Sequence, residues 1–322
     1  MSPITRNDVA RAAGVSTAVV SYVLNDGPRR VSADRRQRVV QAIADLGYRR
    51  DPVAAALSSG RGGTIGLLVP DASNPFFADL ARRIEDAAFA RGYTVLIGNA
   101  AEDRDRETRH LDAFIAQRAA GVIACLADVA SDLPRQIEQL ADRLVLIDRV
   151  PRGWIGRAIA IDNDEGGRLA ASRLVARGCR HCVVIAGPPG FEHVERRVAG
   201  FLGALPKNVD ARVVSARSFG FVDGAAIARG ALDRRTDALF CCTDALAIGA
   251  LAAIAESGRS VPGDIAVVGY DDVPQARATF PPLTTIAQPA DEMARLAVAA
   301  LLDGETVPRG LLRPILVVRE SA

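Results

Sequence analysis

The stretch "TRNDVARAAGVSTAVVSYVLN", Thr5–Asn25, contains two short helical patterns separated by a glycine. Thr5 is a cap candidate with Asp8 three residues later, which is typical of a helix N-terminus. Gly14 can take the positive φ that a tight turn requires. Ser16 is a second cap candidate, and apolar residues follow it at helical spacing. The stretch therefore predicts two helices joined by a turn.

The small and apolar residues of this stretch fit a helix-turn-helix motif, in which a small residue lies where the helices touch and a glycine lies in the turn. These residues are Ala10, Gly14, Val15, Val20 and Val23. A third helix is predicted from Ser32 to Gly47, with Val39, Ile43 and Leu46 on its inner side. The N-terminal segment is therefore predicted to be a small helical head.

The second helix of such a motif lies in the DNA major groove, so its uncharged outer face predicts base contacts. Thr17 can form hydrogen bonds, Ala18 can touch a thymine methyl group, and Tyr22 offers a ring and a hydroxyl. The alternative is that Tyr22 only covers the helix surface. Residues 1–63 carry ten arginines against five aspartates, and we expect these arginines to contact phosphates.

The stretch "YRRDPVAAALSSGRGG", residues 48–63, predicts a short helix followed by a loose linker. Asp51 can cap this helix and Pro52 can begin it, but the helix is too short to be stable alone. A leucine inserted into a minor groove can open a base step, which suits Leu57. We therefore expect a hinge helix that forms on DNA.

Length and composition are those of a globular protein. The 322 residues, 49% of them hydrophobic, can form a large core and more than one domain. No apolar run approaches the ~18 residues of a membrane span, and the N-terminus has no signal-peptide pattern. We therefore expect a cytoplasmic protein without a membrane partner. The five cysteines do not suggest disulfides, and Cys179 and Cys182 lack the further ligands of a zinc site, so no metal or cofactor is expected.

From Thr64 onward, apolar segments of strand length alternate with helical patterns. Strands that are apolar on both faces predict parallel sheets covered by helices, which is an α/β doubly wound body. About ten strands are too many for one compact sheet here, so two lobes are expected. The predicted strands are residues 64–70, 93–99, 121–126, 143–148, 158–162, 182–187, 212–216, 238–242, 265–271 and 284–288.

Ligands of open α/β sheets bind beyond the carboxyl ends of the strands. Several predicted strand ends carry polar or aromatic side chains, namely Asn74, Phe76, Phe77, Arg149, Thr243, Asp244 and Asp271. Considered alone, the two phenylalanines could be core residues at a helix start, and Asp271 could belong to a turn. Without further information, each of these residues is more often structural than ligand-binding.

Seven stretches together resemble the lactose-repressor/galactose-repressor family of transcriptional regulators over nearly the whole chain. They are "DVARAAGVSTAVVSYVLN", "RRDPVAAALSSGR", "IGLLVPDASNPFFADL", "RRVAGF", "VVGYDD", "PPLTTIAQP" and "LVVRES". The resemblance implies a homodimeric repressor that binds near-palindromic operator DNA. It implies DNA contacts at Thr5, Ser16, Thr17, Ala18, Ser21, Tyr22, Asn25, Arg29, Val53, Ala54 and Leu57. Ala18 and Tyr22 differ from the polar pair of well-known members, so no operator sequence is implied.

The same resemblance implies a domain organisation. Residues 1–60 would form the DNA-binding head with its hinge helix, and residues 61–322 the effector-binding and dimerisation domain. This domain would be periplasmic-binding-protein-like, with an N-lobe at about 61–161 plus 290–310 and a C-lobe at about 162–289 plus 311–322. The residues implied around an effector between the lobes are Phe76, Phe77, Arg149, His193, Arg197, Phe219, Thr243 and Asp271.

The expected effector is a sugar, because this pocket chemistry most often serves carbohydrates in the family. A nucleoside or purine is the alternative, with phenylalanine rings as stacking partners. A solute-binding protein for transport would share the body but lack the head. An enzyme is disfavoured, because the sequence has no Gly-x-Gly-x-x-Gly after the first strand, no P-loop and no evident nucleophile–base pair.

Overall fold

The computed structural model describes residues 4–25, 31–48, 63–127, 133–151 and 153–322. The chain divides into two compact units, Met1–Gly62 and Gly63–Ala322. The predicted hinge helix lies outside the described residues. Within them, none of the helices combines the length and the apolar character that crossing a membrane requires.

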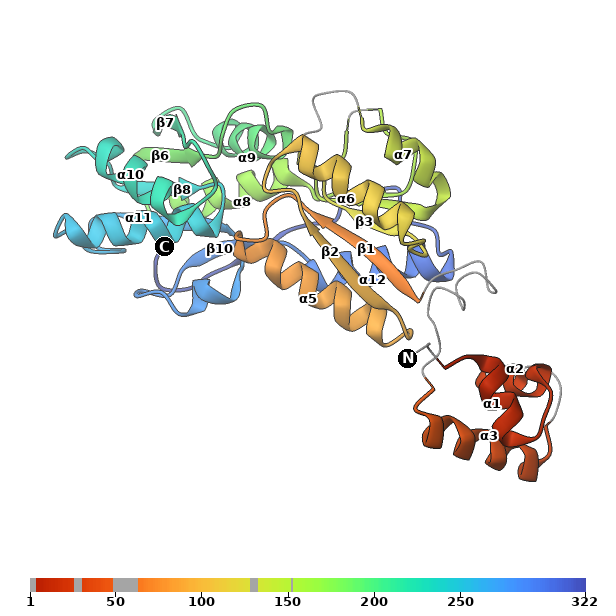
Figure 1. The fold of residues 1–322 in the computed structure, drawn as a ribbon. Helices are drawn as coiled ribbons and strands as arrows, with labels where there is room; N and C mark the ends of the chain where they lie inside the picture. The colour runs from red at the N-terminus through yellow and green to blue at the C-terminus, as the bar shows by residue number, and fades with distance from the viewer. Residues whose placement is uncertain (1–3, 26–30, 49–62, 128–132, 152) are drawn as a thin grey trace. The chain divides into compact units, whose positions relative to one another are not determined.

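The first unit contains the predicted helices α1 (Arg6–Ala13), α2 (Thr17–Asn25) and α3 (Ala33–Leu46) (Figure 1). The Asp8 carboxylate accepts hydrogen bonds from the Thr5 backbone N–H at 2.9 Å and from its hydroxyl at 2.6 Å, and so fixes the start of α1. Gly14 ends α1 with a φ of 62°, and the Ser16 hydroxyl accepts a long hydrogen bond of 3.4 Å from the Val19 N–H. The predicted helix-turn-helix geometry is therefore confirmed.

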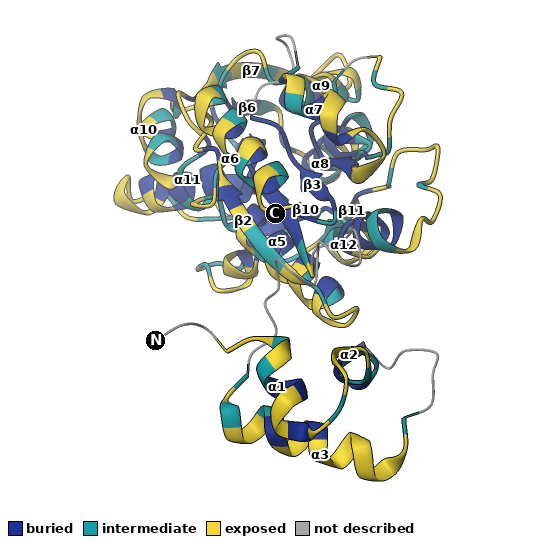
Figure 2. Cartoon of the chain, turned by 45° about the vertical axis from the view of Figure 1, so that its right-hand side comes forward, coloured by how far each residue is buried: buried dark blue, intermediate teal, exposed yellow. Residues whose placement is uncertain are grey.

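A small apolar core holds the three helices of the first unit together. Figure 2 shows its buried positions on the sides of α1, α2 and α3 that face one another. Its buried members are Val9, Ala10, Ala13, Val20, Val23, Val39 and Ala42. Val15, Ile43 and Leu46 pack against this core while half-buried.

The second unit contains two sheets. The first has the order β2-β1-β3-β4-β5 and the second the order β11-β10-β9-β8-β6-β7. The strands of the first are β1 (Thr64–Val69), β2 (Thr94–Asn99), β3 (Val122–Ala124), β4 (Leu144–Ile147) and β5 (Ala158–Ile159). Those of the second are β6 (His181–Ala186), β7 (Asp210–Ser215), β8 (Ala238–Cys241), β9 (Ala266–Asp271), β10 (Thr284–Ala287) and β11 (Ile315–Val317). All ten predicted strands are present, and the two-lobed α/β prediction is confirmed.

Strand β11 was not predicted. It is three residues long, it is exposed or half-buried throughout, and it pairs antiparallel with β10 at the sheet edge. Its apolar run, Ile315–Val318, is short, and the strand lies at a sheet edge rather than buried on both faces as most of the predicted parallel strands are.

Helices cover both faces of each sheet, as Figure 1 shows. The helical segments are α5 (Pro75–Phe89), α6 (Arg104–Ala116), α7 (Arg135–Leu140), η1 (Ala141–Arg143), α8 (Asn163–Ala176), α9 (Glu192–Gly203), α10 (Phe221–Ala231), α11 (Asp244–Glu256), η2 (Pro274–Arg277), α12 (Ala290–Val298) and η3 (Ala299–Asp303). Alternate residues of a strand pack on opposite layers: Val183 and Ile185 of β6 belong to the cluster with α10 and α11, whereas Val184 belongs to the cluster with α8 and α9.

The chain passes between the two sheets three times. It leaves the first sheet after β5 and enters α8, returns from β10 to α12, which packs on α5, and passes from η3 back to β11. Ile161 and Leu312 form a parallel bridge, so the first and third passages lie side by side. We call the part around the first sheet the N-lobe and the part around the second sheet the C-lobe.

Helices α8 and α9 approach each other closely because glycines lie at their contact. A Cβ atom on Gly200 would lie 2.0 Å from the backbone oxygen of Asp164, and one on Gly167 would lie 2.0 Å from that of Arg197. A methyl group at either position would push the two helices apart. The contact therefore fixes where α9 carries its side chains.

We predict that Gly200→Ala lowers the free energy of unfolding by roughly 1–3 kcal/mol, the usual cost of overpacking. Gly203→Ala is the matched control, because Gly203 lies on the same helix and a Cβ atom added there would meet no heavy atom within 4 Å. It should be neutral or slightly stabilising, since alanine favours a helix. Urea denaturation measures both; equal effects would contradict the packing account.

Candidate functional site

One pocket between the two lobes contains all eight residues predicted around the effector. It also contains the strand-end residue Asn74, and Asp148 and Gln288, which were not predicted. The lining residues are Asn74, Phe76, Phe77, Asp148, Arg149, His193, Arg197, Phe219, Thr243, Asp271 and Gln288. The side chains nearly fill it: about 10 Å³ is open to the centre of a water-sized sphere, which is room for about one water molecule.

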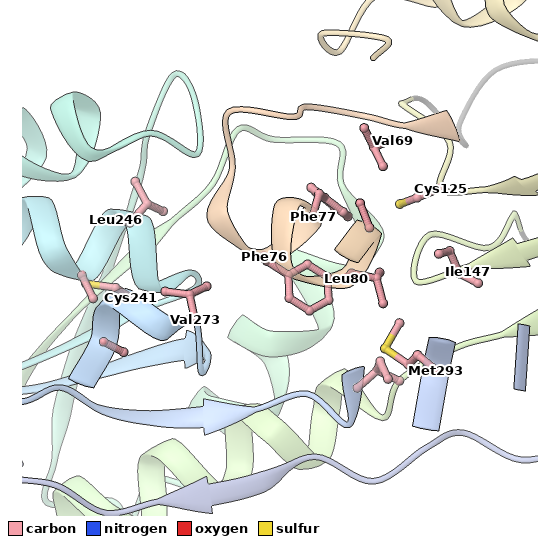
Figure 3. Packing of buried hydrophobic residues seen from close by; sticks show 14 of the residues in the cluster. Val69, Phe76, Phe77, Leu80, Cys125, Ile147, Cys241, Leu246, Val273 and Met293 are labelled. Carbon is pink, nitrogen blue, oxygen red and sulfur yellow. The ribbon is translucent and has the colours of Figure 1, made fainter. Parts of the chain in front are cut away.

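Aromatic side chains form the apolar walls of the pocket. Phe76 and Phe77 lie at the start of α5, 5.2 Å apart and edge to face, and both are almost fully buried. Figure 3 shows them in the same apolar cluster as Val69 and Ile147, so they are core residues as well as pocket residues. On the C-lobe side, Phe219 lies 5.3 Å from Phe191, which was not predicted.

Arg197, on α9, is the C-lobe cation of the pocket, and other C-lobe groups fix its guanidinium. Its Nε donates a hydrogen bond of 2.8 Å to the side-chain oxygen of Asn163, and its Nη1 donates one of 2.7 Å to the Cys242 carbonyl. The guanidinium lies 3.6 Å from the centre of the Tyr270 ring, whose hydroxyl also bonds Asn163. Asn163 is the first residue of α8, directly after the first passage between lobes. Arg197 is therefore hydrogen-bonded to the residue that directly follows the first passage between the lobes.

Asp271, at the end of β9, faces Arg197 at 3.7 Å and accepts a hydrogen bond of 2.7 Å from the Gln288 amide. Its φ is 116° and that of Asp272 is 56°, so two successive residues other than glycine take positive φ values. Such backbone strain clusters at functional sites. Burial raises the pKa of Asp271 to about 7, although Arg197 and then Gln288 oppose the shift.

Arg149, which follows β4, is the N-lobe cation of the pocket. Its Nη1 and Nη2 donate to the two carboxylate oxygens of Glu102 at 2.8 and 2.9 Å. Its guanidinium also lies over two C-lobe rings, 4.8 Å from the centre of Phe191 and 5.6 Å from that of Phe219. Arg149 therefore connects the two lobes at the pocket.

Several buried polar atoms of the pocket lack a partner among the described residues. They are Asp148 Oδ1, Arg149 Nε and Gln288 Oε1. Because an unmet buried donor or acceptor is costly, these atoms favour a ligand with hydrogen-bonding groups of both kinds. Burial, together with Arg149 and Arg197, holds the pKa of His193 well below its usual value, so this imidazole is neutral.

The five cysteines are buried free thiols. Burial raises the pKa of Cys182 to about 12, which leaves a protonated, unreactive group. In the described part of the chain, no group of three or more His, Cys, Asp or Glu side chains could hold a metal ion.

In the head, the structure places most of the predicted DNA-binding residues on or beside α2. Thr5, Ser16, Thr17 and Ala18 are exposed. Ser21 and Tyr22 are half-buried, and Asn25 is the last residue of the helix. The other four predicted residues, Arg29, Val53, Ala54 and Leu57, lie outside the described residues.

A hollow at the turn of the head contains arginines that no sequence motif singles out. Arg11, Arg35 and Arg38 line it together with Ser16. Their only sequence signal was the basic surplus of the whole segment.

Two family models match the chain. Residues 5–51 match bacterial regulatory proteins of the lacI family, and residues 171–322 match a periplasmic binding protein-like domain. A ribose operon repressor of Halalkalibacterium halodurans is 36% identical over 301 residues, which are 92% of this chain and 89% of that protein. The chain belongs to the lacI family of bacterial regulatory proteins. The resemblance inferred from its motifs is confirmed.

Other lacI-family members are similar over the full length. A transcriptional repressor named PurR from Pasteurella multocida is 32% identical, with 98% of each chain covered. The crystal structure of the Lac repressor dimer bound to operator and the anti-inducer ONPF superposes with a TM-score of 0.85, 28% identity and 99% of each chain covered. The relatives are DNA-binding repressors with an effector domain, and this lacI-family chain has the same two parts.

We predict that Asp271 makes the ligand-free protein less stable as pH rises from about 4 to 7. Its folded pKa of about 7 lies above the ordinary aspartate value of 3.8, so the folded state binds more protons in this window and loses that advantage as pH rises. Asp271→Asn should therefore gain stability relative to wild type between pH 5 and 8.

Thermal midpoints measured across this pH range test the prediction. Asp142→Asn, at an exposed position, controls for the loss of one charge. A pH-independent difference between Asp271→Asn and wild type would contradict it.

Proposed function

We propose that this lacI-family regulator is a homodimeric repressor that binds operator DNA through its head and is controlled by an uncharged sugar in the pocket between its lobes. The first candidate is a pentose such as ribose. The observation that carries the proposal is the set of unpartnered buried polar atoms in an aromatic-walled pocket. Each hydroxyl of a sugar both donates and accepts, so it can satisfy acceptors such as Asp148 Oδ1 and the donor Arg149 Nε.

The remaining pocket groups also suit a sugar. Asp271 and Arg197 lie close enough to share a pair of neighbouring hydroxyls. Phenylalanine rings from opposite lobes, Phe76 and Phe219, supply apolar surface for the faces of a sugar ring. The name of the ribose operon repressor, the more identical of the two relatives described, supports a pentose.

A purine is the second candidate. The PurR relative supports it, and the same phenylalanine rings could stack on a planar base. The two candidates differ in how many hydroxyl groups they offer to the unpartnered atoms, so binding measurements separate them.

The control mechanism follows from the position of the pocket. An effector that contacts both lobes binds one lobe arrangement more tightly than another, and this difference in affinity is what shifts the equilibrium between DNA-binding states.

We propose that the dimer forms through residues 61–322, where the apolar side chains of Phe89, Val222 and Phe280 are 79%, 82% and 99% exposed. We also propose a non-catalytic role in the cytoplasm, in keeping with the regulatory role of the relatives.

A ligand screen by thermal shift and calorimetry tests the effector. We expect D-ribose to stabilise the protein and Asp148→Asn to weaken its binding about 10- to 100-fold, because a hydrogen bond to a buried carboxylate is worth about 1.5–3 kcal/mol. The exposed Asp142→Asn should bind as wild type does. Stabilisation by purine bases and not by sugars would favour the purine as the effector. An Asp148→Asn variant with unchanged ribose affinity would contradict the proposal that this pocket binds the effector.

Operator selection from a random DNA library tests the head. Tyr22→Ala should change which bases are preferred, because this side chain lies on the helix expected in the major groove. Val40→Ala is the control, since Val40 is 54% exposed and belongs to α3 rather than to that helix. Identical preferences for Tyr22→Ala and wild type would remove Tyr22 from base recognition.

A further inference from the structure

We propose that Glu102 determines the charge specificity of the effector pocket: by neutralising Arg149 it makes the pocket accept an uncharged polyhydroxyl ligand and reject the phosphorylated form. This inference rests on the proposed effector site. Glu102 does not line the pocket, and neither the sequence motifs nor the comparisons single it out.

The ion pair between Glu102 and Arg149 involves both terminal nitrogens of the guanidinium. The two side chains form parallel hydrogen bonds of 2.8 and 2.9 Å, and Arg149 Nη1 also donates to the Ala127 carbonyl at 3.1 Å. The Arg149 side chain is 3% exposed and that of Glu102 is 29% exposed, so water reaches the pair from the Glu102 side while the guanidinium itself is buried. Both terminal nitrogens are therefore engaged within the protein, and only Nε is left without a partner among the described residues.

The backbone around Glu102 is built to place its carboxylate. Ala101 and Glu102 have φ values of 50° and 54°, a conformation that residues other than glycine adopt at a cost. The Asn99 side-chain oxygen accepts hydrogen bonds from the N–H groups of Ala72 and Ala101, both at 3.1 Å. The Glu102 N–H donates to the Pro70 carbonyl at 2.7 Å. These hydrogen bonds within the loop therefore fix the position of Glu102.

Aromatic rings set the direction of Arg149. Its guanidinium lies 4.8 Å from the ring centre of Phe191, 5.6 Å from that of Phe219 and 5.8 Å from that of Phe77. Cation–π attraction to these rings stabilises the charge without offering it to a ligand. Without Glu102, the same site would be a buried cation with one N–H group on each terminal nitrogen released, and a phosphate binds such paired N–H groups.

No other lining residue supplies a free positive charge in place of that of Arg149, which Glu102 neutralises. His193 is neutral, and Arg197 already bonds Asn163 and the Cys242 carbonyl. The remaining ionisable lining groups are Asp148 and Asp271. A phosphate would therefore meet carboxylates and unpartnered acceptors rather than a free cation, and it has no protons to donate to them when fully ionised.

The test compares D-ribose with D-ribose 5-phosphate by calorimetry on the full-length chain. For Glu102→Gln, which keeps the shape of the side chain, we expect the affinity for the phosphate relative to ribose to rise at least tenfold. Glu138→Gln, the same change at an exposed position on α7, should leave the ratio unchanged. Glu102→Asp keeps the charge and should retain the wild-type preference even where the shorter side chain lowers stability.

Two results would overturn the inference: an unchanged ratio in Glu102→Gln, or a wild type that binds the phosphate as tightly as ribose. The proposal that ribose is the effector has a separate test, which is whether wild type binds ribose at all. If wild type binds purines instead, the same ratio is measured with guanosine and guanosine monophosphate, which differ by the phosphate alone, with the same expected direction.

Discussion

The buried guanidinium of Arg197 is the constraint on which the rest of the pocket depends. A charge removed from water must have its N–H groups satisfied, and here the partners come from separate parts of the C-lobe. Asn163 begins the helix that follows the first passage between lobes, the Cys242 carbonyl lies after β8, and Tyr270 belongs to β9. In the account proposed above, a shift at the passage displaces the side chain that faces Asp271 and so links lobe arrangement to ligand contacts.

Arg149 is the N-lobe counterpart of Arg197 and is satisfied differently. Its charge is cancelled by Glu102 in its own lobe, while its flat face rests on rings of the other lobe. The lobes thus meet through a neutralised cation and aromatic surface, with unpartnered acceptors left between them in the described part of the chain. This combination favours a ligand rich in hydroxyl groups.

Local sequence patterns were enough to predict the ten strands β1 to β10 and the three helices of the head. Buried parallel strands appear as apolar runs, and the head appears as caps, a turn glycine and helical spacing. The eight pocket residues required the family resemblance, because phenylalanines at a helix start fit a core equally well. Phe191, Gln288 and Glu102 were missed because their roles depend on tertiary contacts; Glu102 pairs with a residue 47 positions away, and no local spacing signals it.

The most direct test of the account is to titrate the effector into the free protein and into the protein–operator complex. If pocket and head are coupled through the lobes, the effector Kd must differ between the two, and the operator Kd must change by the same factor when effector is added. Equal effector affinity in both titrations would contradict the account, because the pocket would then bind a ligand that does not control DNA binding.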